Sequence, residues 1–528
     1  MPAAALAPPL VEITRRGDEL ILRSPTPLQP HARCLGDLLE GHAARTPDRV
    51  FLAERPPDDP MNDWRTITYG EAFAAVRALG QALLDLGLGP ARPLLLLSDN
   101  GIDHALLQLA AMHVGVPAAP VSPAFSLLSR DHRKLRDIAA LLDPGAVYAE
   151  SGGAYARALD ALALDGIPHI QCRDPRPAAL LVDDLRRTLP GAAERAAFAA
   201  LTPDTIAKVL FTSGSTGAPK GVINTQRMLC ANQQAIAQLW PLLGARPPVV
   251  VDWLPWSHTF GGNHNFNMVL HAGGTLHIDP GKPVAGAIEK TIAALREISP
   301  TIYFNVPRGF DLLVHHLERD EALRARFFAD LDFVFYAAAA LPQALWTRLE
   351  AVARAAGVTE LRLLSAWGST ETAPLATSVH YPNNRAGVIG LPAPGTEIKL
   401  APVGNKHELR VRGPNVTPGF WITGGAIQPA VLDEEGFFHT GDAGRLADEQ
   451  DPARGLLFDG RIAENFKLSS GTWVSVGEVR QGVIAAGAPL VQDVVVTGHD
   501  QRSLGLLVFP SLPACRAIAG EAATDLPV

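Results

Sequence analysis

A run of small polar residues between two apolar segments has the composition of a phosphate-binding loop. The apolar segment that ends at Phe211 is followed by a stretch rich in Gly, Ser and Thr that leads to Lys220. The glycines let backbone N–H groups converge on an anion, the hydroxyls add short donors, and the lysine supplies a mobile charge. The loop residues expected to bind phosphate are Thr212, Ser213, Gly214, Ser215, Thr216 and Gly217.

Two other interpretations of this loop fit less well. A flexible linker would not lie between two β-like apolar runs or end in Pro-Lys-Gly. An NTPase P-loop needs Ser or Thr after the lysine, and Gly221 stands there. The stretch T-S-G-S-T-G-x-P-K-G instead resembles the phosphate loop of the adenylate-forming superfamily, which includes acyl- and aryl-CoA synthetases, peptide-synthetase adenylation domains and luciferases. This resemblance implies that ATP and Mg²⁺ bind here, with Lys220 catalytic and Thr216 near the metal.

A second group, Ala366 to Glu371, follows an apolar strand-like segment. Ligands bind at strand ends in open α/β sheets, although these residues also fit the capped start of a helix. The group resembles the superfamily's aromatic-Gly-x-Thr-Glu motif. The resemblance implies that Trp367 packs on adenine in place of the usual Tyr, that Thr370 meets the α-phosphate and that Glu371 binds Mg²⁺. The last two would be catalytic, and Gly368 would contact the acid substrate.

Three further segments resemble the remaining nucleotide motifs. Thr440-Gly441-Asp442 is by itself a common turn, but it resembles the family's ribose-binding motif and implies that Asp442 binds the ribose hydroxyls. Asp459-Gly460-Arg461 resembles the inter-domain hinge and implies that Arg461 reaches ribose and phosphate oxygens. The alanine-rich segment after Tyr336 resembles the strand end that flanks adenine and the acyl group. It places Ala338 at the nucleotide and Ala339 at the acid.

The segment from Trp253 to His264 is rich in aromatic and histidine residues. The resemblance implies that His258 gates the substrate carboxylate and takes part in catalysis. A metal site that combines His258 and His264 with the histidines at 271 and 277 is disfavoured. No H-E-x-x-H spacing occurs, and glycines interrupt a single helical face.

The same segment and residues 465–477 resemble feruloyl-CoA synthases more than general fatty-acid enzymes. The resemblance predicts a hydroxycinnamate such as ferulate as the acid and CoA as the co-substrate. A pocket that pairs an aromatic ring with a polar group is one interpretation, and a simple hydrophobic core is the other. The pocket residues would be Asn263, Phe266 and Phe304, beside His258.

The implied reaction has two halves, in which the carboxylate attacks the α-phosphate of ATP and CoA then displaces AMP after the small domain rotates. The small domain departs from the family's pattern. Ala463 replaces the usual charged hinge residue, and no P-x-S/T-x-S/T-G-K segment precedes Val528. We therefore expect slow adenylation by this chain alone, with nucleotide binding preserved. A fatty- or other acyl-CoA synthetase, an enzyme that loads a carrier protein, and a nucleotide-binding module without turnover remain open.

The composition of the 528 residues is that of a soluble globular protein, with 47% hydrophobic and 19% charged residues. A net charge of −8 gives no basic surface for nucleic acid or an anionic membrane. The cysteines are scattered, and neither a signal peptide nor a membrane-spanning apolar run is evident. We expect a cytoplasmic monomer or homodimer.

Alternating strand and helix patterns around these groups predict α/β layers with largely parallel sheets. Thr68 and Glu71 fit a capping box at the start of a helix, and the Pro-rich residues 1–30 are expected to form an extended surface arm. Short β segments between Gly and Pro predict a small barrel-like subdomain at about 387–438. The predicted organisation is a large N-terminal domain of layered α/β subdomains, 1–460, and a small, apparently truncated C-terminal α+β domain, 461–528.

Overall fold

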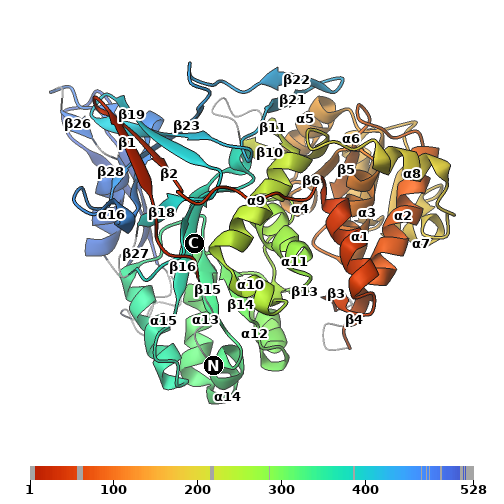
Figure 1. Cartoon of the computed structure of the whole chain (residues 1–528), viewed down its shortest axis with the longest axis horizontal. Helices are drawn as coiled ribbons and strands as arrows, with labels where there is room; N and C mark the ends of the chain where they lie inside the picture. Colours follow the sequence, from red (N-terminus) through yellow and green to blue (C-terminus); the bar gives the residue numbers. More distant parts are fainter. Residues whose placement is uncertain are drawn as a thin grey trace.

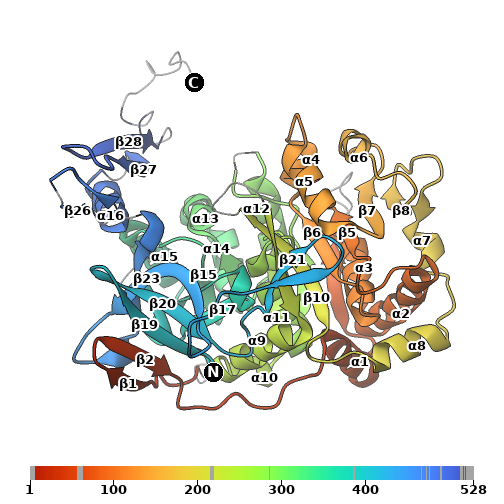
Figure 2. The same cartoon turned by 90° about the horizontal axis from the view of Figure 1, so that it is seen from above.

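The computed structural model of the chain has a large layered α/β body and a smaller C-terminal part (Figures 1 and 2). The mixed α/β fold predicted from the sequence is confirmed. The domain boundary at about residue 460 stays a prediction. The structure describes residues 6–55, 63–213, 219–284, 286–383, 387–464, 466–470, 472–474, 476–487, 490–511, 515 and 518.

A nine-stranded sheet carries the predicted phosphate loop between two of its strands. β10 runs parallel to β6 and antiparallel to β11, and it is β10 that ends where the predicted loop begins. Loop residues 214–218 lie outside the described residues. The sheet order is β22 (Ala426–Pro429), β21 (Gly419–Ile422), β11 (Pro219–Thr225), β10 (Ile206–Ser213), β6 (Ala118–Val121), β5 (Leu94–Leu97), β7 (Ala146–Ser151), β8 (His169–Arg173) and β9 (Leu180–Leu181).

An eleven-stranded sheet carries the predicted motifs that contain Trp367, Asp442 and Arg461. Its last three strands are parallel to one another and the others pair antiparallel. The order is β1 (Glu12–Arg16), β2 (Glu19–Arg23), β19 (Glu397–Val403), β20 (Lys406–Arg412), β23 (Phe438–Leu446), β24 (Leu456–Arg461), β18 (Val388–Pro392), β17 (Leu375–Val379), β16 (Leu363–Gly368), β15 (Phe333–Tyr336) and β14 (Ile302–Asn305).

Two of the structural details differ from the sequence-based expectation. Residues 12–23 form the β1–β2 hairpin, which adds to the edge of the eleven-stranded sheet, and the segment from there to α1 runs as an extended arm (Figure 2). The short β segments of the predicted subdomain divide between two sheets, because β21 and β22 pair with β11. β18, β19 and β20 enclose a core of their own with β2 and β24.

The remaining strands form one small sheet and two hairpins. The four-stranded sheet is β12 (Val249–Asp252), β13 (Thr275–Ile278), β3 (Val50–Glu54) and β4 (Arg65–Thr68). The C-terminal hairpins are β25 (Phe466–Lys467) with β26 (Trp473–Val474), and β27 (Val491–Thr497) with β28 (Gly505–Pro510). Figure 2 shows α16, β27 and β28 set apart from the large body.

The helices cover the sheets and enclose two large hydrophobic clusters. Thr68 caps α2 and Glu71 completes the predicted capping box. In the described residues, no helix is both long and apolar enough to span a bilayer. The α-helices are α1 (Leu35–Arg45), α2 (Tyr69–Asp85), α3 (Ile102–His113), α4 (Pro123–Leu127), α5 (Arg133–Leu142), α6 (Ala156–Leu162), α7 (Val182–Leu185), α8 (Ala192–Ala199), α9 (Gln226–Leu239), α10 (Leu242–Ala245), α11 (Phe266–Ala272), α12 (Ile288–Glu297), α13 (Pro307–Arg319), α14 (Glu321–Phe328), α15 (Gln343–Ala355) and α16 (Val476–Ala486). A π-helix, η1 (Phe260–Asn265), precedes α11, and the 3₁₀ helices are η2 (Thr370–Thr372), η3 (Pro452–Arg454) and η4 (Ile462–Glu464).

Candidate active site

The β10–β11 hairpin holds the two ends of the predicted phosphate loop in register. Thr212 pairs with Lys220 across the two strands. The Lys220 side chain is exposed, and its Nζ lies 5.6 Å from the centre of the Phe420 ring. The ammonium therefore lies outside the hydrophobic core, at the base of the loop. Four predicted phosphate ligands lie outside the described residues: Gly214, Ser215, Thr216 and Gly217. The Ser213 side chain is not described either.

Trp367, Asp442 and Arg461 come from three separate strands and meet at one carboxylate. The indole Nε1–H of Trp367, at the end of β16, donates a hydrogen bond to Asp442 Oδ2 at 2.9 Å. Arg461 pairs with Asp442 across β23 and β24, and its Nε lies 3.3 Å from Oδ1. The structure thus brings together the predicted adenine, ribose and hinge residues. It adds the indole–carboxylate bond, which a stacking role for the ring had not indicated.

The environment of Asp442 opposes its negative charge. Burial raises the pKa of its carboxyl, while the bond from Trp367 and the charge of Arg461 lower it. The nearby carboxylates of Glu464 and Glu371 raise this pKa further. Glu371 therefore lies close enough to Asp442 to affect its charge, as expected if both side chains face one nucleotide.

The loss of the indole N–H should weaken nucleotide binding measurably. Trp367→Phe keeps an aromatic ring but removes the donor to Asp442, and a hydrogen bond to a charged group contributes about 1.5–3 kcal/mol. We expect about a tenfold or larger rise in Kd for AMP, measured by isothermal titration calorimetry. Trp346→Phe is the matched control because Trp346 makes the same kind of bond, to Glu350 at 2.9 Å, on α15. Equal AMP affinity in wild type and Trp367→Phe would contradict this role.

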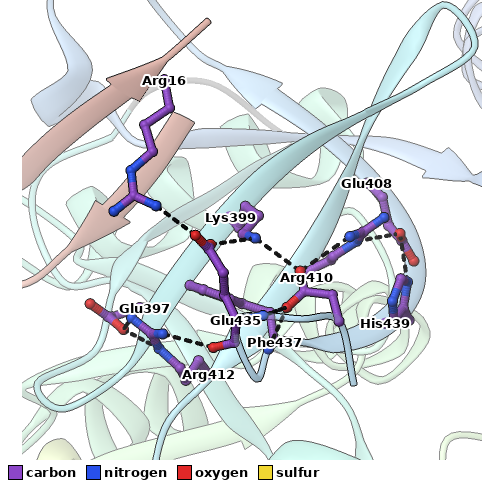
Figure 3. A network of polar contacts seen from close by, with 10 residues as sticks. Arg16, Glu397, Lys399, Glu408, Arg410, Arg412, Glu435, Phe437 and His439 are labelled. Carbon is purple, nitrogen blue, oxygen red and sulfur yellow. Dashed lines mark hydrogen bonds and ion pairs between the residues drawn. The ribbon is translucent and has the colours of Figure 1, made fainter. Parts of the chain in front are cut away.

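A network of ion pairs holds the turn that presents Asp442 (Figure 3). Glu408 on β20 accepts a hydrogen bond from the backbone N–H of Gly441 at 3.1 Å, and its other oxygen lies 3.1 Å from His439 Nδ1. Gly441 has a φ of +72°, which favours glycine, so the turn is held in a conformation that few other residues adopt. Arg410 links Glu408 to Asp433, and Arg410 and Lys399 share that second carboxylate. Sequence reasoning missed Glu408, whose charge within a β-like segment was the available signal.

The 3₁₀ turn η2 carries Thr370 and Glu371 directly after β16. A Cβ on Gly368 would lie 1.7 Å from the Pro374 carbonyl oxygen, so only glycine fits where the strand turns. The buried Asn224 on β11 donates to the carbonyl of Thr370 at 3.3 Å. Its Oδ1 accepts a hydrogen bond from Asn263 of η1. Asn224 therefore joins the predicted phosphate and carboxylate sides of the site, and the sequence signal for it was a polar residue within an apolar strand.

The π-helix η1 presents the predicted carboxylate residues and is held by its carbonyl groups. Lys208 Nζ donates to the Gly262 carbonyl at 3.2 Å, and Gln233 Nε2 donates to the Asn263 carbonyl at 2.7 Å. The exposed His258 precedes the helix, and its Nδ1 accepts a hydrogen bond from the Phe260 N–H at 3.2 Å. Its other ring nitrogen is then the one that carries a proton in neutral imidazole.

The other predicted substrate residues separate into three places. Phe304 packs against the η1 side chains, with its ring centre 5.6 Å from that of His264. Phe266 lies elsewhere in the core, 4.8 Å from the Trp256 ring and 5.7 Å from the Phe51 ring. Ala338 and Ala339 are exposed where β15 ends, and Ala338 has a φ of +72°. Phe304 and Asn263 thus stay together near η1, whereas Phe266 does not join them.

The hinge segment is fixed by a buried lysine. Lys406 Nζ on β20 lies 3.2 Å from Asp459 Oδ1, and its side chain is 5% exposed. Gly460 has a φ of +79°, and a Cβ there would lie 3.5 Å from the Cα of Gly477 near the start of α16. The chain therefore leaves β24 through a turn that is clamped on one side by Lys406. Ala463, the departure from the family's hinge, follows in η4.

The donors at η2 fit a magnesium ion that is held jointly with phosphates. Mg²⁺ takes oxygen ligands and often uses only one or two carboxylates with substrate phosphates and water. Glu371 offers such a carboxylate, half-buried and close to Asp442. Among the described residues, no three His, Cys, Asp or Glu side chains gather as a metal cage. The arrangement suits a metal that arrives with a nucleotide.

A protein-family model described as AMP-binding enzyme matches residues 39–421, which include β10, β11, η1 and η2. The chain belongs to the AMP-binding enzyme family. This AMP-binding enzyme is 28% identical over 460 residues to a 3-[(3aS,4S,7aS)-7a-methyl-1,5-dioxo-octahydro-1H-inden-4-yl]propanoyl:CoA ligase of Mycobacterium tuberculosis, covering 84% of this chain and 82% of the relative. It is 31% identical over 324 residues to a long-chain-fatty-acid–CoA ligase of Escherichia coli, covering 58% of this chain and 52% of that enzyme.

Solved structures support the fold of this AMP-binding enzyme. A crystal structure of the anthranilate CoA ligase AuaEII with anthranoyl-AMP matches with a TM-score of 0.70 at 20% identity, over 91% of this chain and 87% of that one. The O-succinylbenzoate coenzyme A synthetase of Bacillus subtilis, in complex with AMP, matches with a TM-score of 0.68 at 18% identity, over 92% and 90% of the two chains. These likenesses establish the large N-terminal and smaller C-terminal arrangement.

Proposed function

We propose that this AMP-binding enzyme joins an aromatic carboxylic acid of the hydroxycinnamate class, such as ferulate, to CoA through an acyl-adenylate. The observation that carries the proposal is the meeting of Trp367, Asp442 and Arg461, since three motifs distant in sequence form one polar group that suits adenosine. The CoA ligases among its relatives support the thiol as acceptor.

In the first half of this reaction the chain must position a carboxylate against the α-phosphate of ATP. Lys220 and the hydroxyls beside it would hold the phosphates and balance the charge that develops on them. Asp442 would accept hydrogen bonds from the ribose hydroxyls, with Trp367 beside the base. Glu371 would hold Mg²⁺, which supplies positive charge to the phosphate oxygens when it is bound.

His258 suits the carboxylate side of this site. Although His258 keeps access to solvent, the protein around its ring lowers the pKa of the imidazole by partial desolvation, which favours the neutral form at pH 7. Because Nδ1 accepts the Phe260 N–H, Nε2 carries the proton and would donate a hydrogen bond to an acid oxygen. Asn224 would keep His258 and Thr370 in place, because it connects η1 and η2. A neutral donor orients the carboxylate without neutralising it as a nucleophile.

A fatty acid is the second candidate substrate. The similarity to the long-chain-fatty-acid–CoA ligase of Escherichia coli favours it. The aromatic side chains next to Asn263 favour a flat ring instead, because aromatic rings gain contact area and edge-to-face attraction from one another. Transfer to a carrier protein is a third possible outcome of the second half-reaction.

A panel of acids distinguishes these candidates. Ferulate, 4-hydroxycinnamate, benzoate, octanoate and palmitate would each be incubated with the chain, ATP, Mg²⁺ and CoA, and AMP and acyl-CoA measured by chromatography. We expect the hydroxycinnamates to give the highest kcat/KM and a CoA thioester. Octanoate or palmitate as the best substrate would replace the aromatic assignment by the fatty-acid one. If AMP forms when a carrier protein is supplied but not when CoA is supplied, the carrier protein would replace CoA as the acyl acceptor. If no acid in the panel gives AMP, the proposed ligation would be refuted.

A further inference from the structure

His264 lies inside a box of aromatic rings and is not used by the site described above. The box consists of His264 and the rings of Trp240, Phe260, Phe304 and Phe335, which come from η1, β14, β15 and the end of α9. The His264 ring centre lies 5.0 Å from that of Phe335, 5.6 Å from Phe304, and 5.7 Å from both Phe260 and Trp240. His264 is 1% exposed, so its imidazole is buried among apolar groups.

A chain of hydrogen bonds fixes which nitrogen of His264 carries the proton. Asn265 Nδ2 donates to the buried Asp252 Oδ2 at 2.8 Å. The amide oxygen of Asn265 therefore faces His264 Nδ1, at 2.9 Å, and accepts a hydrogen bond from its N–H. Burial lowers the pKa of His264 to about 4, so the ring is neutral at pH 7. Nε2 is then left with a bare lone pair.

This lone pair has no partner in the part of the chain that the structure describes. His264 Nε2 is buried without a hydrogen bond, and so is the Nε1–H of Trp240 in the same box. An unpaired buried acceptor or donor destabilises the folded state, so such groups in folded proteins are usually satisfied by water or a ligand. His264 Nε2 is an acceptor and Trp240 Nε1–H is a donor. A hydroxyl group can donate a hydrogen bond to the first and accept one from the second.

The position of the box relative to His258 suits the far end of an acid substrate. His258 lies just before η1 and His264 within it, six residues later, and a helical rise of about 1.5 Å per residue separates them by roughly 9 Å along the segment. Asn263, which lies next to His264, is tied to Asn224 and through it to Thr370. An acid whose carboxylate meets His258 would therefore extend along η1 toward the box.

We infer that His264 and Trp240 form hydrogen bonds with a ring hydroxyl of the acid substrate and so make the site selective for phenolic acids. In this arrangement the hydroxyl donates its proton to His264 Nε2 and accepts from Trp240 Nε1–H, while the rings of Phe304 and Phe335 contact the aromatic ring. Asp252 and Asn265 act at a distance by fixing the tautomer of His264. The inference rests on the proposed function, because it names the substrate class at that site.

The selectivity follows from the cost of leaving these groups unpaired. A site that is built to hydrogen-bond a hydroxyl discriminates strongly against the analogue without it, because its own buried groups then stay unsatisfied. A site lined only by apolar rings would accept cinnamate and 4-hydroxycinnamate about equally or prefer the apolar acid. The ratio for these two acids therefore separates a hydroxyl-reading site from a plain hydrophobic core.

The test compares these two acids on wild type and on His264→Phe, which keeps an aromatic ring and removes the acceptor. Wild type is expected to favour 4-hydroxycinnamate by at least about tenfold in kcat/KM, and His264→Phe to bring this ratio close to one while it still ligates cinnamate. An unchanged ratio in His264→Phe, or no preference in wild type, would overturn the inference. Trp240→Phe, which removes only the donor, provides the same comparison if His264→Phe does not fold.

Calorimetric binding of each acid to the full chain, without ATP, separates this inference from the proposed ligation. If wild type binds 4-hydroxycinnamate more tightly than cinnamate and His264→Phe does not, the inference stands even if no acyl-CoA forms. If neither acid binds, or both bind equally, the inference fails, whatever acid the panel identifies. Phe328→Leu, outside the box on α14, controls for general loss of aromatic packing.

Discussion

Replacing Lys220 by methionine is expected to slow acyl-adenylate formation by about 10²- to 10³-fold, the usual loss when one charge-stabilising group is removed from a transition state. Lys220 is exposed and stands at the base of the loop, so its removal should not disturb the core. Methionine keeps most of the side-chain length but cannot balance the charge on the phosphate oxygens. Acid-dependent exchange of labelled pyrophosphate into ATP measures this step.

Lys290→Met is the matched control for Lys220→Met, because Lys290 is also exposed and lies on α12, outside the candidate site. It should retain the wild-type exchange rate. A rate for Lys220→Met within twofold of wild type would remove Lys220 from the reaction. A lower thermal stability of Lys220→Met would instead assign its effect to folding.

A second large effect is expected on the pH dependence of stability, from Lys208. Burial lowers the pKa of Lys208 to about 7, and its Nζ is bonded to the Gly262 carbonyl beneath η1. Between this pKa and its ordinary value the unfolded chain binds the proton and the folded chain does not. Stability from this group therefore rises with pH above about 7. The facing His104 has a pKa of about 4, through burial, and stays neutral throughout this range.

The measurement is the free energy of unfolding in urea at pH 7 and pH 9. Wild type should gain about 2 kcal/mol relative to Lys208→Met between these two values, because the linkage is at most about 1.4 kcal/mol per pH unit. Lys290→Met should follow wild type. Parallel pH profiles of wild type and Lys208→Met would show that Lys208 is equally protonated in both states.

The features that depend on neighbouring residues could be predicted from the sequence. The helix that starts at Tyr69 is an example, because its capping box needs only Thr68 and Glu71. The alternation of strands and helices gave the fold class for the same reason, and Trp367, Asp442 and Arg461 were found through short motifs.

Features that depend on distant contacts could not be predicted in the same way. Asn224 looks like an isolated polar residue in an apolar strand, and its role depends on Thr370 and Asn263, which are far away in the chain. Phe266 and Phe304 have the same character in the sequence, yet packing places the first beside Trp256 and the second beside His264. Phe266 lies at the start of α11 and Phe304 on β14, and tertiary packing of these two elements, which no local pattern reports, decided this.

Through the two oxygens of Asp442, the affinity for the nucleotide and the position of Arg461 depend on each other. Oδ2 is engaged by Trp367, and Oδ1 faces Arg461 at the end of β24. A ribose whose hydroxyls donate hydrogen bonds to this carboxylate must share it with Arg461 or displace Arg461, where the chain leaves the eleven-stranded sheet. By linkage, any rearrangement that moves Arg461 away from Asp442 changes the affinity for the nucleotide by the same factor by which the nucleotide favours that rearrangement. The Asp442 side chain thus couples the binding of the nucleotide to the path of the residues that follow Arg461.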